Sequence, residues 1–143
     1  MSGRLILVAD TSDGILDTLR EVLAATDYEL LHAKDGQRAI DHLESPWSEI
    51  DLAIVELGLP GVDGLDVIWR LVRRRKGAKP IKIIAVSAME VQPLLKQVVK
   101  ELGVDAVVQI PIPREDWCPL ISAVLRGEPS VFSQNTDLPS AIM

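Results

Sequence analysis

Short aliphatic runs alternate with amphipathic stretches along most of the chain, and this alternation restricts the fold more than any other feature. Each of five strand-length apolar runs is followed by a stretch whose apolar residues recur at helical spacing. Strands that alternate with helices form a parallel sheet covered on both faces. The sequence therefore predicts an α/β fold with strands at 5–9, 28–33, 52–55, 81–86 and 106–110, and helices at 15–23, 36–43, 65–76, 90–102 and 115–126.

The composition of the strands predicts their order. The first, third and fourth are almost unbroken aliphatic runs, as expected of central parallel strands, whereas the second carries Glu29 and His32 and suits an edge. This favours a flavodoxin-like sheet of order 2-1-3-4-5, in which ligands bind beyond the carboxyl ends of strands one and three. Asp10, Thr11 and Glu56 stand there. We expect one domain over residues 1–127 and a loose tail over 128–143.

Composition and charge exclude several classes of protein. No apolar run approaches the ~20 residues that span a bilayer, and no signal peptide follows Met1. Cys118 is the only cysteine, which excludes an intrachain disulfide and a multi-cysteine metal site. A net charge of −6 argues against general nucleic-acid binding. We therefore expect a cytoplasmic protein that has no membrane or nucleic-acid partner.

The charge is unevenly distributed along the chain. Residues 1–66 contain 14 acidic and 4 basic residues, and seven of the remaining bases lie between Arg70 and Lys82. This basic run is either a contact patch or the solvated end of a helix, where cations suit the helix dipole. We favour the solvated helix end, because charge runs of this kind are only suggestive.

Four segments, in order and at characteristic spacing, carry a family resemblance. They are 4–10, with its terminal Asp10; 51–64, with Glu56 and a Pro-x-x-Asp-Gly loop; 84–88, with Ser87; and 103–111, with Pro111. Together they resemble the receiver domain of two-component response regulators over roughly residues 4–126. The resemblance also implies a cis peptide bond before Pro111.

The resemblance implies a phosphorylation site that is altered in this chain. Glu56 stands at the position of the aspartate that accepts the phosphoryl group, and Ile110 at that of the lysine. Asp10 matches the first of two cation-binding acids, whereas Thr11 replaces the second. Ser87 matches the switch hydroxyl. In addition, Val107 replaces the aromatic residue of the switch.

These replacements predict a degenerate receiver, or pseudo-receiver. Glutamate is longer than aspartate by one methylene, roughly 1.5 Å, so its carboxylate enters the space of the phosphoryl group or metal. A neutral hydroxyl is a poor Mg²⁺ ligand, and the lost lysine removes a fixed charge from the transition state. Asp10 and Glu56 leave at most a weak Mg²⁺ site, and we expect no other cofactor.

The expected function is therefore signal transduction by a module that is not an enzyme. We expect it to bind a protein such as a histidine kinase or an output protein, or a second copy of itself through the face formed by 90–102, 106–110 and 115–126. Lys96, Lys100, Glu101, Arg114 and Asp116 would line that face. Glu56 could also mimic the phosphorylated charge state.

Two alternative functions stay open at this point. The first is an ordinary phosphorelay in which Asp10 or Asp63 accepts the phosphoryl group. The second is a flavodoxin-like small-molecule binder, in which 11–14 would form a phosphate loop at a helix N-terminus.

A few other residues receive structural interpretations. His32 and His42 are expected at the surface and Cys118 in packing. Trp69 and Trp117 fit the edge of a helical core, or a partner surface if they are exposed.

Overall fold

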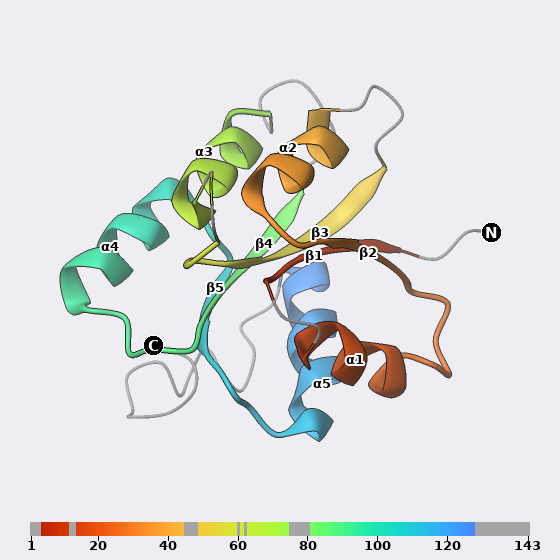
Figure 1. The fold of residues 1–143 in the computed structure, drawn as a ribbon. Coiled ribbons are helices and arrows are strands. Elements are labelled where there is room, and N and C mark those ends of the chain that lie inside the picture. The colour runs from red at the N-terminus through yellow and green to blue at the C-terminus, as the bar shows by residue number, and fades with distance from the viewer. Residues whose placement is uncertain are drawn as a thin grey trace.

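Strands and helices alternate from one end of the fold to the other (Figure 1). The computed structural model describes residues 4–11, 14–44, 49–59, 61, 63–74 and 81–127. All five expected strands and all five expected helices are present. Their bounds are β1 (Leu5–Ala9), α1 (Gly14–Val22), β2 (Glu29–Ala33), α2 (Gly36–Glu44), β3 (Ile50–Glu56), α3 (Gly64–Arg74), β4 (Lys82–Ser87), α4 (Pro93–Leu102), β5 (Ala106–Gln109) and α5 (Arg114–Arg126).

The five strands form one parallel sheet of order β2-β1-β3-β4-β5, which confirms the predicted fold class. On β1, Val8 lies beside His32 of β2 and Ile54 of β3. Burial explains this order, because β1, β3 and β4 are almost wholly buried, while Glu29 on β2 is exposed. The edge position of β2 tolerates the polar residues that a central strand would not.

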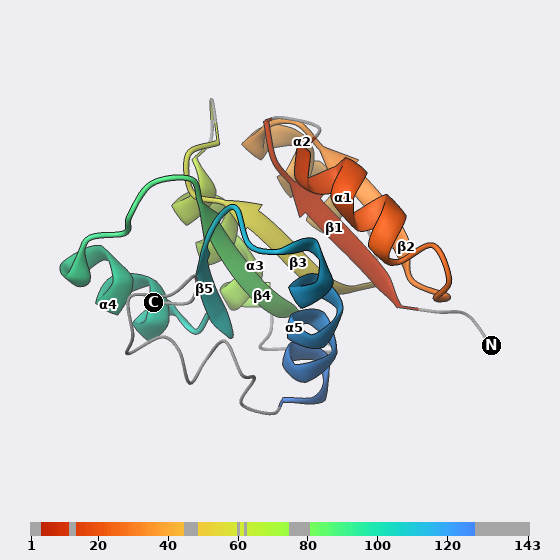
Figure 2. The same ribbon diagram turned by 90° about the horizontal axis from the view of Figure 1, so that it is seen from below.

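Two apolar clusters cover the two faces of the sheet. On β1, Leu7 and Ala9 belong to the cluster that packs under α2, α3 and α4, while Ile6 and Val8 belong to the cluster with α1 and α5. Figures 1 and 2 show these helices on opposite sides of the sheet. Adjacent residues of a strand point to opposite faces, so each central strand contributes to both clusters.

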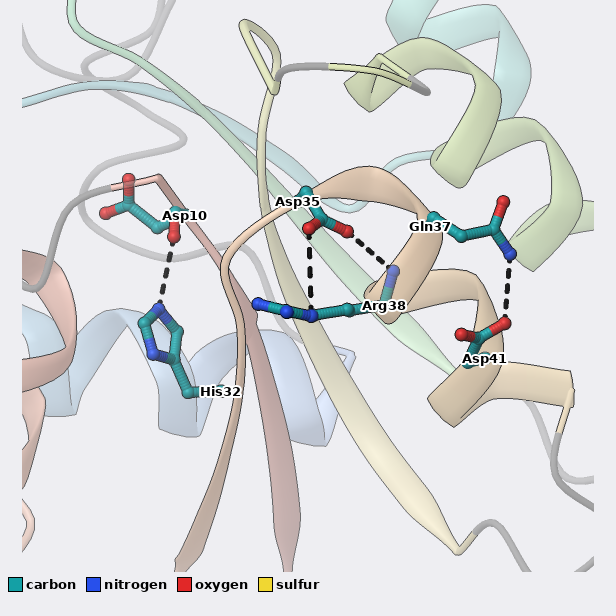
Figure 3. Close-up of polar contacts among 6 residues, drawn as sticks. All are labelled: Asp10, His32, Asp35, Gln37, Arg38 and Asp41. Atoms are coloured by element: carbon teal, nitrogen blue, oxygen red, sulfur yellow. Dashed lines mark hydrogen bonds and ion pairs between the residues drawn. The ribbon is translucent and has the colours of Figure 1, made fainter.

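The structure corrects the start of the fourth helix, which was expected at residue 90. The helix begins at Pro93 because proline suits the first helical turn and disfavours helical geometry in the residue before it. Gln92 is accordingly extended, with φ −59° and ψ 146°. The start of α2 matches its prediction, and the Asp35 carboxylate accepts a hydrogen bond from the Arg38 N–H at 2.8 Å (Figure 3).

Some sequence expectations fall outside the described residues, among them the tail over 128–143 and the end of the third helix beyond residue 74. Of the two tryptophans named above, Trp117 is buried and Trp69 is 48% exposed. Cys118 is half-buried and its Sγ contacts the Val22 carbonyl at 3.3 Å, in keeping with a packing role. No helix in the described ranges is both long enough and apolar enough to cross a bilayer.

Candidate functional site

The carboxyl edge of the sheet brings the two expected acidic positions together. Ala9 pairs with Val55 across β1 and β3, so Asp10 and Glu56 are the next residues at the ends of neighbouring strands. Asp10 is 2% exposed, whereas Glu56 is half-buried at the rim. The topology therefore places these side chains as the sequence predicted.

Thr11 is bonded directly to Glu56. Its backbone N–H and its Oγ1 hydroxyl both donate to Oε1 of Glu56, each at 3.0 Å. Hydrogen bonds to a charged acceptor are stronger than bonds between neutral groups. The threonine thus holds the carboxylate of Glu56 with neutral donors from the same chain, a contact that the sequence alone did not reveal.

Asp10 is fixed through its main chain. Its N–H donates to the Ala33 carbonyl at 3.0 Å, and its own carbonyl oxygen lies 3.1 Å from Nε2 of His32 (Figure 3). Because a carbonyl only accepts, this contact is a hydrogen bond when Nε2 carries the proton. His32 was expected at the surface, but it is half-buried and helps to position the backbone from which Thr11 reaches Glu56. His32 lies near the end of the edge strand and pairs with Val8 of β1, and this position was the signal in the sequence for such a role.

Ser87 closes β4 at the same edge, but its hydroxyl serves the following turn. Oγ donates to the Met89 carbonyl at 2.8 Å and accepts the Met89 N–H at 3.1 Å. These bonds engage the hydroxyl within the turn after β4. Ser87 therefore ends a strand at this edge of the sheet, and the hydrogen bonds of its hydroxyl are made with Met89.

Ile110 follows β5 and places an apolar side chain beside the site. Its N–H donates to the Ser87 carbonyl at 2.9 Å, and its side chain packs against the cluster formed with α1 and α5. The peptide bond between Ile110 and Pro111 is cis, as the resemblance implied. A cavity of about 290 Å³ opens here, lined mainly by apolar residues: Gly14, Ile15, Thr18, Ala88, Ile110, Pro111, Ile112 and Trp117.

The start of α3 packs on the backbone of Glu56. A Cβ atom added to Gly64 would lie 2.2 Å from the Glu56 carbonyl oxygen and 2.7 Å from Cα of Leu57. Asp63 caps this helix, because its Oδ1 accepts the Asp66 N–H at 3.0 Å. Gly64 thus controls how closely α3 approaches the end of β3, and its position at the start of the helix is the signal in the sequence.

The described residues offer a divalent cation few charged ligands at this edge. Within the described ranges, no three His, Cys, Asp or Glu side chains gather in a group that could hold a metal ion. Oε1 of Glu56 already accepts two hydrogen bonds from Thr11. Mg²⁺ is usually held by one or two carboxylates and waters in octahedral geometry, so a cation here would compete with Thr11 for Oε1 of Glu56.

Comparison with known proteins identifies close similarity to response regulators. The family model described as response regulator receiver domain matches residues 6–121. The response regulator RppA of Synechocystis is 35% identical over 81 residues, covering 57% of this chain and 34% of that protein. A two-component response regulator-like protein of rice (Oryza sativa subsp. indica) is 27% identical over 104 residues, covering 73% of this chain and 14% of that protein. PhoP of Bacillus subtilis, an alkaline phosphatase synthesis transcriptional regulatory protein, is 28% identical over 142 residues, which cover 96% of this chain and 57% of that protein.

Solved structures agree with the fold. A CheY-like receiver domain protein from Methanospirillum hungatei has a TM-score of 0.77 at 23% identity, covering 88% of this chain and 96% of that one. The HemR receiver domain from Leptospira biflexa has a TM-score of 0.73 at 23% identity, covering 86% and 94%. The chain spans less than two thirds of the length of the curated relatives described above. With the family model matched over most of its length, the chain belongs to the response regulator receiver domain family.

Proposed function

We propose that this domain is a receiver that accepts no phosphoryl group and transmits signals by binding other proteins. The observation that carries this proposal is the pair of hydrogen bonds from Thr11 to Oε1 of Glu56. An attacking carboxylate oxygen must approach phosphorus in line, and positioning errors near 1 Å can cost about 100-fold in rate. A carboxylate that is lengthened by a methylene and held by Thr11 is poorly placed for that attack.

The charge around Glu56 also disfavours transfer. Phosphoryl transfer relies on cations that neutralise the charge developing on the equatorial oxygens. Here Asp10 and Glu56 contribute two carboxylates, while Ile110 contributes an apolar side chain at the expected lysine position. An incoming phosphoryl donor would meet negative charge with no lysine at that position to offset it.

Phosphorylation of another aspartate has less structural support. Asp63 would have to give up its capping bond to the Asp66 N–H at the start of α3. Asp10 is 2% exposed, which restricts access for a phosphoryl donor. We therefore prefer the non-phosphorylated module to a phosphorelay that uses either of these acids.

We further propose that the domain signals in one fixed state of the pocket. Glu56 supplies a permanent negative charge, and Thr11 keeps that charge in one place. Val107, at the position of the switch aromatic, is buried to 1% exposure and has no ring that could change position. A domain with one constant state is better suited to permanent binding of a partner protein than to switching by phosphorylation.

The face formed by α4, β5 and α5 is the first candidate for that docking. Lys96, Lys100 and Glu101 border a hollow of about 440 Å³ on α4, and Leu94 is 75% exposed nearby in the helix. Arg114 forms an ion pair with Glu21 of α1, so part of its charge is already neutralised within the domain. We propose that a histidine kinase, an output protein or a second copy binds this face in the cytoplasm.

Treatment with acetyl phosphate is expected to leave the mass of the protein unchanged. Without an aligned aspartate, a cation-binding pair and a lysine, no acyl phosphate should accumulate. Intact-mass spectrometry with saturating Mg²⁺ measures this directly, and a phosphorylatable receiver run in parallel shows that the reagent is active. A gain of one phosphoryl group on Glu56 or another acid would contradict the proposal.

Titration with Mg²⁺ is expected to give no saturable heat below the millimolar range. The reason is that a cation would have to displace the Thr11 donors from Glu56 and would meet a neutral hydroxyl at position 11 instead of a carboxylate. Isothermal calorimetry measures the heat, with buffer dilution as the control. A dissociation constant in the micromolar range would show that the pocket retains a working cation site.

A further inference from the structure

We infer that the outer face of α3 docks an acidic segment of another protein. This face consists of Asp66, Trp69, Arg70 and Arg73. The inference deepens the proposed function, because it rests on the domain acting through protein binding and names a surface and a partner chemistry. It does not depend on whether Glu56 can be phosphorylated.

Helix geometry turns these residues away from the sheet. Val67, Ile68 and Leu71 are fully buried and face the core under α3. At 100° per residue, Trp69 and Arg73 lie on the opposite side of the helix, with Asp66 and Arg70 beside them. All four are exposed, so they form one continuous strip along the helix.

Trp69 is the centre of this strip. The side chain is 48% exposed, and the guanidinium carbon of Arg73 lies 4.5 Å from the centroid of its ring. Tryptophan and arginine are the residues most enriched among those that dominate binding energy at protein interfaces. By contrast, Trp117, the other tryptophan among the described residues, is only 3% exposed.

A hollow beside the strip offers room for an apolar side chain. It has a volume of about 360 Å³ and lies between α2 and α3, where Ile40, Leu43, Glu44 and Arg70 line it. Arg70 borders both the hollow and the strip, and its NH1 lies 3.7 Å from Oε2 of Glu44. A segment that crosses α3 could therefore place an apolar residue here while its acids meet the guanidinium groups.

Charge selects an acidic partner. Arg70 and Arg73 lie on the strip, Arg74 ends the helix, and three further bases follow at Arg75, Lys76 and Lys79. The chain as a whole carries a net charge of −6, whereas the strip carries two guanidinium groups and one carboxylate, so its own charge favours an acidic segment. Such complementarity steers encounter and fixes orientation. The stacking of Arg73 on Trp69 thus favours the contact-patch interpretation for Arg70 and Arg73, the first two bases of the basic run.

The test is a titration of the full chain, labelled with 5-fluorotryptophan, with a short synthetic peptide that carries several glutamates around one leucine. The expected result is a saturable shift of the Trp69 fluorine signal, assigned with the Trp69→Phe variant. The double variant Arg70→Glu, Arg73→Glu should weaken binding at least about tenfold, and added salt should weaken it further. The matched control Arg4→Glu, Arg20→Glu makes the same charge change just before β1 and on α1, and should bind as the wild type does.

Several results would overturn this inference. The first is a Trp69 fluorine signal that does not shift when the peptide is added. The second is a peptide with glutamine in place of glutamate that binds as tightly as the acidic peptide. The third is a control variant that loses as much affinity as the double variant on α3. Tighter binding of an oligothymidylate would assign the strip to nucleic acid, and sedimentation showing dimers that the α3 variant abolishes would assign it to a second copy. The acetyl phosphate experiment measures intact mass, whereas this test measures peptide binding. Phosphorylation could therefore be found while the peptide still binds α3, or the peptide could fail to bind while the domain stays unphosphorylated.

Discussion

Three substitutions made together, Thr11→Asp, Glu56→Asp and Ile110→Lys, are expected to convert this domain into one that is phosphorylated by acetyl phosphate. The expected gain in acyl phosphate formation is at least about 10³-fold over the natural chain. The sheet already places positions 11 and 56 at the ends of neighbouring strands, with position 110 just after β5, so the topology brings all three positions to the same edge of the sheet. Intact-mass spectrometry after incubation with Mg²⁺ measures the gain.

The effect is expected to be large because each of the three groups meets a different requirement of phosphoryl transfer. Aspartate at position 56 withdraws the carboxylate by one methylene and restores room for the phosphoryl group. Aspartate at position 11 removes the hydroxyl that donates to Oε1 and completes an acidic pair with Asp10 for the cation. Lysine at position 110 returns a fixed positive charge to the transition state. Groups that act as a unit are strongly non-additive, so each single variant should remain close to the natural chain.

The single variants are therefore the matched controls, and Glu56→Asp alone is the most informative of them. If it were phosphorylated as readily as the triple variant, the length of the side chain would be the whole defect, and the roles given to Thr11 and Ile110 would be wrong. Circular dichroism and an Mg²⁺ titration of the triple variant show whether it is folded and binds the cation. A folded triple variant that binds Mg²⁺ and still gains no mass would contradict the account of the site.

Much of this site could be predicted from the sequence, because it depends on backbone topology. Aliphatic runs specify parallel strands, and parallel strands bring their carboxyl ends to one edge. Asp10 directly follows the first of these runs, and Glu56 is the last residue of β3. Their proximity could therefore be predicted without any side-chain information. The edge position of β2 followed in the same way from Glu29 and His32.

The remaining features depend on side-chain rotamers and local turns, which periodicity does not specify. The bonds from Thr11 to Glu56 and the turn that engages Ser87 each require one side-chain orientation among several. Trp69 and Trp117 both occur in amphipathic helices, and only the packing of each helix made the first exposed and the second buried. The start of α4 could be predicted from Pro93, because proline prefers the first helical turn. This preference is a stronger indication than the apolar spacing, which placed the start at residue 90.

The substitution Gly64→Ala is expected to lower the free energy of unfolding by about 1–3 kcal/mol, the range for overpacking a well-filled site. The added Cβ would stand 2.2 Å from the Glu56 carbonyl oxygen and 2.7 Å from Cα of Leu57. Both atoms belong to the backbone, so the clash is relieved only if α3 moves away from the end of β3. Urea denaturation followed by circular dichroism gives the difference, provided that the slope of the transition is unchanged.

Gly58→Ala is the matched control, because a Cβ at Gly58 would meet no atom within 4 Å and the residue does not need a positive φ. Both variants restrict the unfolded chain equally, an effect of roughly 0.4–1 kcal/mol in favour of folding. Their difference therefore isolates the clash at the start of α3. Equal midpoints for the two variants would mean that α3 can shift without cost, and that the backbone of Glu56 is not held by the helix that follows it. A large difference, with the Gly58→Ala midpoint at or above that of the natural chain, would show that Gly64 is needed for α3 to pack on the strand end that carries Glu56.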